Sequence, residues 1–153
     1  MKKFFASFGY AFRGLAETLL RERNMRVHLC FCVFVTFFGF ICGIESYEWL
    51  AAVILMGLVI SAEAHNTAIE QTLDRIGTEH NEQTRRAKDA AAGGVLAAAI
   101  FAAIGGGLIF FRKARVDAAL DFFKAYPWAI AIVAAALVGA VVFVALAGRK
   151  RER

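Results

Sequence analysis

Four apolar runs dominate this sequence and restrict what the chain can fold into. They are Leu29–Ile44, Trp49–Ala62, Ala90–Phe111 and Ala125–Gly148. The last two contain no charged residue over 22 and 24 positions, and a helix needs about 20 apolar residues to cross a bilayer, with about 17 as the lower limit. The first two reach this length if His28 and the turn containing Glu63 lie within or at the edge of the membrane. We therefore predict an all-α membrane protein with four transmembrane helices.

Composition agrees with this prediction. The 153 residues are 59% hydrophobic and 20% charged, with a mean hydropathy of +0.57, values that a soluble domain seldom reaches. The single proline, Pro127, and the lack of a repeat or a Ser/Gly-rich linker indicate one unit of packed helices. The three cysteines have no C-x-x-C spacing, so we interpret them as packing residues. They are Cys30, Cys32 and Cys42.

The basic residues predict an orientation. If both termini are cytoplasmic, 14 of the 18 Lys and Arg residues lie inside, as the positive-inside rule requires. Four aromatic residues then fall at the outer interface, namely Tyr47, Trp49, Tyr126 and Trp128. The net charge of +5 is explained by this topology and by attraction to anionic lipids, so we expect no nucleic-acid partner.

An amphipathic segment precedes the first apolar run. Apolar side chains recur there at steps of three and four residues, at Phe4, Phe8, Phe12, Leu15 and Leu19. The segment is too polar to span a bilayer and has no A-x-A-type cleavage site, so it predicts an N-terminal amphipathic helix on the inner surface of the membrane. The alternative is a helix packed on the bundle as part of its core.

A stripe of polar residues continues the second run. Glu63, Glu70 and Asp74 fall within roughly 40° of one another around a helix, and Asn66 flanks them. Unpaired charges at membrane depth are costly, so they are retained where they face a protein interior, a cation or a water-filled pocket. The alternative is a helix that leaves the membrane early, with its acidic residues simply solvated.

Three more charged residues fall on the same side of the membrane, namely Glu22, Lys88 and Asp89. Carboxylates suit Mg²⁺, which binds one or two of them together with phosphate oxygens, and a lysine is a natural phosphate partner. The pattern predicts a cation and phosphate site at the cytoplasmic edge, although Lys88 and Asp89 alone fit ordinary charges at a helix start. A small four-span proton-coupled transporter using Glu63 is the alternative function, and a purely structural subunit explains none of these residues.

The segments "ERNMRVH", "EAHNTAIEQTLD" and "RAKDAAAGGVL" closely resemble the small prokaryotic lipid kinases, diacylglycerol kinase and its undecaprenol kinase relatives. The resemblance covers roughly residues 3 to 113. It implies a homotrimeric inner-membrane enzyme with active sites between subunits, which transfers the γ-phosphate of ATP to the hydroxyl of a membrane lipid alcohol with Mg²⁺ as cofactor. Between undecaprenol and diacylglycerol as acceptor, undecaprenol is slightly favoured.

The resemblance also assigns roles. Glu63 is the expected general base, Glu22 and Glu70 are the expected Mg²⁺ ligands, and Asn66 and Asp74 are further polar members of the site. The expected nucleotide-binding residues are Lys88, Asp89, Tyr10, Lys3, Glu79, His80 and Asn81. The chain departs from the three-span family in a fourth span. We therefore expect a kinase domain over residues 1–113 and an additional transmembrane helix with a basic cytoplasmic tail over 114–153.

Overall fold

The computed structural model describes residues 2–76 and 81–146, and within them the chain forms six α-helices and no strand. The helices are α1 (Lys2–Arg21), α2 (Arg23–Cys42), α3 (Ser46–Ile76), α4 (Glu82–Phe110), α5 (Lys113–Ala125) and α6 (Trp128–Ala145). Of these described helices, α2, α3, α4 and α6 are long and apolar enough to cross a membrane. The predicted all-α architecture with four membrane-spanning helices is confirmed.

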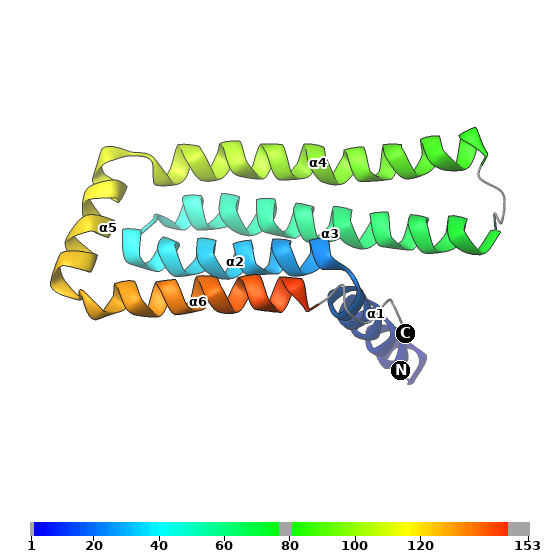
Figure 1. Cartoon of the computed structure of the whole chain (residues 1–153), viewed down its shortest axis with the longest axis horizontal. Helices are drawn as coiled ribbons and strands as arrows, with labels where there is room; N and C mark the ends of the chain where they lie inside the picture. The colour runs from blue at the N-terminus through cyan, green and yellow to red at the C-terminus, as the bar shows by residue number, and fades with distance from the viewer. Residues whose placement is uncertain (1, 77–80, 147–153) are drawn as a thin grey trace.

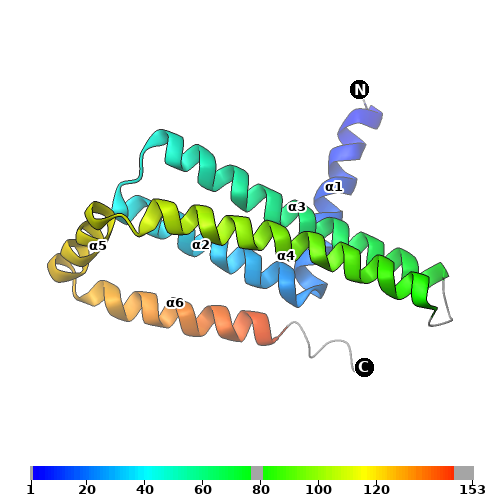
Figure 2. The ribbon, with the colours of Figure 1, turned by 90° about the horizontal axis from the view of Figure 1, so that it is seen from above.

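The four spanning helices lie roughly side by side along the long axis of the molecule (Figure 1). In both ribbon views α6 lies at one edge of the bundle (Figures 1 and 2), and it is in contact with α2. The most extensive packing joins α3 to α4. The core therefore consists of α2, α3 and α4, and the additional span lies at its edge.

Helix α1 leaves the bundle at a steep angle (Figure 2). It contacts α2 and α3, while Phe4, Phe5, Phe8 and Phe12 are exposed. Exposed phenylalanines on a helix that projects from the spans suit a helix lying in the membrane surface. The predicted N-terminal amphipathic helix is present as α1.

Two glycines allow neighbouring helices to approach closely. A Cβ added to Gly105 of α4 would lie 2.5 Å from Cδ1 of Leu55 on α3, and one added to Gly39 of α2 would lie 2.6 Å from the Trp49 ring. Only a residue without a side chain fits at such contacts, which is how small residues let membrane helices pack. Trp49 is consequently packed against α2 rather than standing free at the interface.

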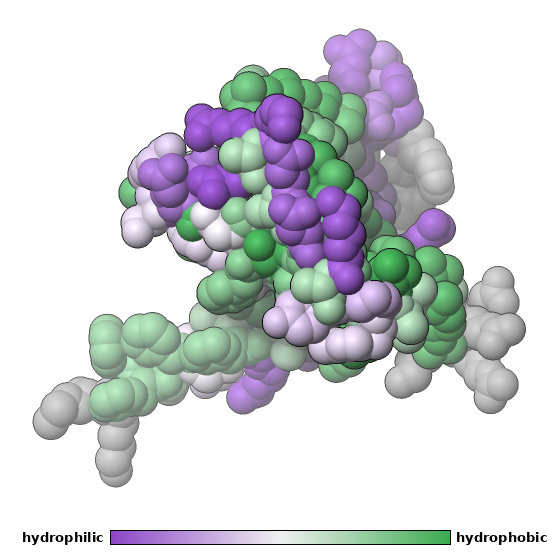
Figure 3. Space-filling view, turned by 90° about the vertical axis from the view of Figure 1, so that its left-hand side faces the viewer, coloured by the Kyte–Doolittle hydropathy of each residue, from purple (hydrophilic) through white to green (hydrophobic). Residues whose placement is uncertain are grey.

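Helix α5 lies between the last two apolar runs, where the sequence predicted no helix. The spacing of its charged residues supports a helix: Lys113 pairs with Asp117 at 2.7 Å and Lys124 with Asp121 at 3.0 Å, the separations at which side chains meet on a helix surface. Figure 3 looks onto this end of the bundle and shows hydrophilic side chains gathered across it. The connection between α4 and α6 is thus a polar helix across the end of the bundle.

Candidate active site

The polar stripe lies on one uninterrupted helix, α3. Glu63 is only 2% exposed, and its Oε2 atom has no hydrogen-bond partner. One turn further on, Asn66 donates from Nδ2 to Oε1 of Glu70 at 3.1 Å, while its own Oδ1 is buried without a partner. Buried polar atoms are nearly always hydrogen-bonded in proteins. Two orphaned acceptors in adjacent turns therefore indicate a site that receives hydrogen-bond donors from a ligand.

Glu22 joins this site from the connection between α1 and α2. Its backbone is extended at the N-cap position of α2, and its side chain makes no capping hydrogen bond. The carboxylate is therefore not engaged by the helix start, and it lies near enough to Glu63 to interact with it electrostatically, as does that of Glu70. Like charges repel, so a cation bound near Glu63 would offset the repulsion that Glu22 and Glu70 exert on it.

Glu63 and Asn66 border a pocket of about 260 Å³ between α2, α3 and α4, which neither Glu22 nor Glu70 lines. Its polar lining consists of Asn24, His28, Glu63 and Asn66, and its other lining residues are apolar. Asn24 and His28 were not predicted as site residues. Their spacing of four residues places both on one face of α2, and this spacing next to Glu22 is the signal that could have found them.

Lys88 and Asp74 form a second group nearer the connection between α3 and α4. The Lys88 ammonium is hydrogen-bonded to the Asp74 carboxylate, which links α4 to α3. Asp89 instead pairs with Arg85 on its own helix at 3.0 Å, and both side chains are exposed. The structure thus joins Asp74 to Lys88, while Asp89 faces solvent beside a basic residue.

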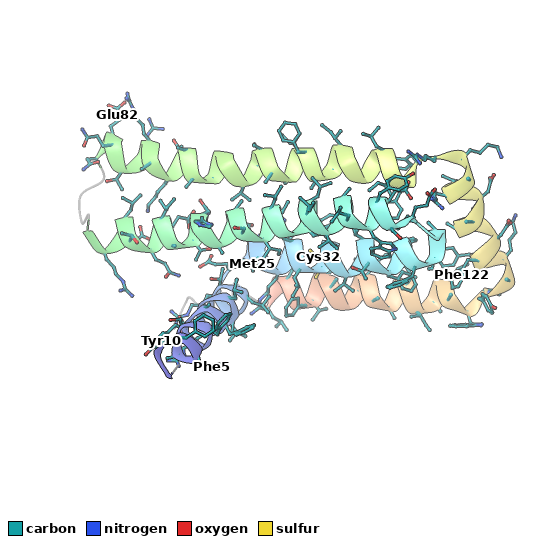
Figure 4. All side chains as sticks on the ribbon, turned by 180° about the vertical axis from the view of Figure 1, so that it is seen from behind. Phe5, Tyr10, Met25, Cys32, Glu82 and Phe122 are labelled. Carbon is teal, nitrogen blue, oxygen red and sulfur yellow. The ribbon has the colours of Figure 1, made fainter. Side chains whose placement is uncertain are left out.

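Of the remaining predicted nucleotide contacts that the structure describes, Tyr10 lies apart from the start of α4 and Asn81 lies at it (Figure 4). Tyr10 is exposed on α1, where the Arg13 guanidinium lies 5.6 Å from its ring centre, and it is well separated from the start of α4 at Glu82 (Figure 4). Asn81 caps α4, accepting a 2.7 Å hydrogen bond from the backbone N–H of Thr84.

Three further residues predicted to contact the nucleotide lie outside what the structure describes. They are Glu79, His80 and the side chain of Lys3.

Divalent cations differ in how many protein ligands they need. Among the described residues, no three His, Cys, Asp or Glu side chains come together as a metal site. Glu22 and Glu70 supply two carboxylates, and the hydrogen bond from Asn66 engages only one oxygen of Glu70. Because Mg²⁺ characteristically binds one or two carboxylates and completes its shell with phosphate oxygens and waters, these residues fit Mg²⁺ better than a metal that needs a complete protein cage.

Comparison with known proteins bears on the same region. The family model described as prokaryotic diacylglycerol kinase matches residues 9–110. An undecaprenol kinase of Bacillus subtilis is 41% identical over 113 residues, which is 74% of this chain and 92% of that protein. A diacylglycerol kinase of Haemophilus influenzae is 36% identical over 105 residues, 67% of this chain and 87% of that protein. No solved structure matches the chain significantly.

A diacylglycerol kinase of Synechocystis is also 36% identical, over 67% of this chain and 59% of its own length. The matched region contains every residue that lines the pocket beside Glu63, which we call the carboxylate pocket, and it excludes α5 and α6. These comparisons give no support to the transporter alternative. The chain belongs to the prokaryotic diacylglycerol kinase family.

Proposed function

We propose that this protein is an ATP- and Mg²⁺-dependent lipid kinase that phosphorylates the hydroxyl of a membrane lipid alcohol. The observation that carries the proposal is Glu63, a buried carboxylate with an unpaired oxygen, set beside two further carboxylates within the region that matches the family. Phosphoryl transfer needs positioning and charge stabilisation, with little covalent work by the protein. The site offers both.

Glu63 is the proposed general base. Glu63 lines the pocket and its Oε2 has no partner, so a lipid hydroxyl placed there can donate its hydrogen bond to the Glu63 carboxylate. As the hydroxyl oxygen attacks the γ-phosphorus, the proton passes to Glu63, the bond from the γ-phosphorus to the bridging oxygen breaks, and ADP departs with that electron pair. Asn66, also with a buried acceptor, helps to hold the ligands of the site.

Glu22 and Glu70 are the proposed Mg²⁺ ligands. A bound Mg²⁺ neutralises charge on the phosphates and fixes their position. The two carboxylates come from different elements, the α1–α2 connection and α3, so their separation depends on how α1 meets the bundle. The hydrogen bond from Asn66 orients the Glu70 carboxylate, as outer partners of metal ligands commonly do.

Lys88 and Asp89 are the proposed nucleotide contacts at the start of α4, with Asp74 as the partner that orients Lys88. ATP binding replaces part of this ion pair with a lysine–phosphate contact. Tyr10, Lys3, Glu79, His80 and Asn81 are retained as secondary contacts. Because Tyr10 is distant from α4 within one chain (Figure 4), a shared site between neighbouring subunits of a homotrimer is the arrangement that accommodates it.

Undecaprenol is the favoured acceptor, with diacylglycerol as the second candidate. The undecaprenol kinase relative aligns over a longer part of this chain and at higher identity than the Haemophilus diacylglycerol kinase, which supports this choice. We place the protein in the bacterial inner membrane with both termini cytoplasmic, following its basic residues.

The test is a phosphorylation assay of the purified full-length protein with ATP, with and without Mg²⁺, against undecaprenol and diacylglycerol in the same detergent. We expect Mg²⁺-dependent release of ADP and a higher kcat/KM for undecaprenol. Equal or greater turnover of diacylglycerol would reverse the acceptor assignment, and no ADP release with either lipid would refute the proposed function.

A further inference from the structure

A second cavity extends from the carboxylate pocket towards the α5 end of the bundle. It measures about 320 Å³ and lies between α2, α3 and α4. Its walls are apolar and include Leu55, Met56 and Val59 of α3 and Ala102 and Gly106 of α4. A cavity of this composition suits a hydrocarbon chain rather than a nucleotide.

The two cavities meet at three shared lining residues, Val27 and His28 of α2 and Ala99 of α4. His28 is the polar member of this junction. It is half-buried, and within the described residues its ring makes no hydrogen bond. A half-buried imidazole without a partner has donor and acceptor capacity available to a ligand.

We propose that His28 positions the lipid acceptor, donating a hydrogen bond to its hydroxyl oxygen while the adjoining hydrocarbon occupies the α2/α3/α4 cavity. This inference rests on the proposed kinase function and adds to it a substrate-positioning residue. With the hydroxyl at the junction, its proton can be donated to Glu63, which lines the adjoining pocket and has an unpaired oxygen. The lipid hydroxyl oxygen has two lone pairs. One accepts the hydrogen bond from the imidazole N–H, and the other can attack the γ-phosphorus.

The size of the cavity limits what it can hold. At about 320 Å³ it is at the low end of ligand pockets, which span roughly 300–1,000 Å³. It therefore holds only the part of an isoprenoid or acyl chain next to the hydroxyl, and the rest of the chain lies among the membrane lipids. Selectivity then depends on the polar junction, since a short apolar wall discriminates weakly between hydrocarbons.

Two adjacent glycines distinguish this cavity from a packed interface. A Cβ added to Gly105 would collide with Leu55, whereas one added to Gly106 meets nothing within 4 Å. Gly106 lines the cavity, so a larger residue there fills space that is open in the chain itself. Gly57 of α3 is a matched position, because an added Cβ also meets nothing and the residue lines neither cavity.

The experiment compares His28→Leu and His28→Gln in the full-length protein, titrating undecaprenol at saturating ATP and ATP at saturating lipid. Loss of one hydrogen bond should raise the lipid KM of His28→Leu about 5- to 20-fold, with the ATP KM within about twofold of wild type. His28→Gln keeps a hydrogen-bond donor, so its lipid KM should lie close to that of the wild type. The control is His65→Leu, since the His65 ring lies 2.7 Å from the Ser61 carbonyl and lines neither cavity.

A second pair of variants tests the cavity independently of His28. Gly106→Leu should raise the lipid KM by a similar factor, and Gly57→Leu should leave it unchanged. An unaltered lipid KM in both His28→Leu and Gly106→Leu would overturn this inference while the kinase assignment stands. A wild-type protein without lipid-dependent ADP release would instead refute the proposed function. An equal rise of the lipid KM in His65→Leu and His28→Leu would also count against the inference.

Discussion

Two buried glutamates on α3 have opposite surroundings. Glu48, near the start of the helix, and Glu63, four turns later, are each 2% exposed. Glu48 accepts from Arg112 at 3.0 Å and Arg115 at 2.8 Å, and also from the backbone N–H of Glu45 at 2.8 Å. Glu63 has an oxygen with no partner, and its charged neighbours are other carboxylates.

The difference shows how a buried charge can be assigned a role. Arg115 also donates to the carbonyls of Cys42 and Gly43, so the Glu48 cluster fastens the α2–α3 turn to the start of α5. Gly43 has a φ of +59°, a conformation that favours glycine. Its carbonyl in this turn is one of the two to which Arg115 donates. Every charge there has a partner, as expected of a structural element, whereas the Glu63 end leaves acceptors open for a ligand.

The largest expected effect is on turnover in Glu63→Gln. The amide keeps the size of the side chain but cannot accept the proton, so kcat should fall by about 10²–10⁴. Affinity for ATP and Mg²⁺ should change little, because Glu22 and Glu70 remain. Single-turnover phosphorylation and nucleotide binding, measured in one lipid mixture, check both statements.

Glu48→Gln is the matched control, an equally buried carboxylate on the same helix. It should retain kcat within about twofold, since it lies far from the site. A near-normal kcat in Glu63→Gln, or a loss of nucleotide binding there, would show that Glu63 is not the base.

A smaller effect is expected from removing a proposed metal ligand. Glu70→Gln still accepts the hydrogen bond from Asn66 but loses its negative charge, so the apparent affinity for ATP should weaken by about tenfold at limiting Mg²⁺. Excess Mg²⁺ should restore part of it. The measurement is the apparent affinity for ATP, titrated at several Mg²⁺ concentrations.

Glu22→Gln should behave in the same way, because Glu22 is the second proposed ligand. Glu82→Gln serves as control, since its carboxylate is exposed and pairs with Arg86 on the same helix. A loss of ATP affinity in Glu70→Gln that does not vary with Mg²⁺ would speak against a metal role.

The two ends of α3 also differ in how far the sequence could predict them. Helical spacing alone placed Glu63, Asn66 and Glu70 on one face, because these residues share an element and i to i+4 geometry is local. The partners of Glu48 are 64 and 67 residues away along the chain, and no local pattern encodes such a pairing. The Glu48 cluster was therefore not predicted at all.

Other features of the structure were also not predicted from the sequence. The charges of α5 divide its apolar residues into short groups, so no helix was predicted there although its ion pairs have helical spacing. Gly105 of α4 packs closely against Leu55, while the neighbouring Gly106 faces a cavity. Which face of a helix meets a neighbour depends on tertiary packing that sequence spacing does not specify.

The third prediction concerns stability. Glu48→Gln leaves two arginines without their carboxylate, so the midpoint of thermal unfolding should fall by several degrees, because a buried ion pair that loses one partner is destabilised. Glu63→Gln should not lower the midpoint, since it removes a buried charge that has no partner. Thermal unfolding followed by tryptophan fluorescence compares them.

Glu45→Gln provides the matched control at the same end. Glu45 is exposed and meets Arg115 only at 3.4 Å, so the midpoint should stay close to that of wild type. A fall in Glu45→Gln as large as that in Glu48→Gln would mean that burial does not set the strength of this cluster.

The smallest effect on activity is expected from removing the additional span by truncation after Lys124. All proposed site residues precede that point, and α6 packs at the edge of the bundle against α2 (Figure 1). Arg26 loses its 2.8 Å hydrogen bond to the Phe143 carbonyl but keeps those to Leu19 and Leu20 at 3.0 and 2.7 Å. Because Arg26 still fastens α1 to α2, the position of Glu22 should persist and kcat/KM should stay within about twofold. The measurement is lipid-dependent ADP release by the truncated protein, with its assembly state followed by size-exclusion chromatography, and complete loss of activity in a folded, correctly assembled protein would show that α6 contributes to the site.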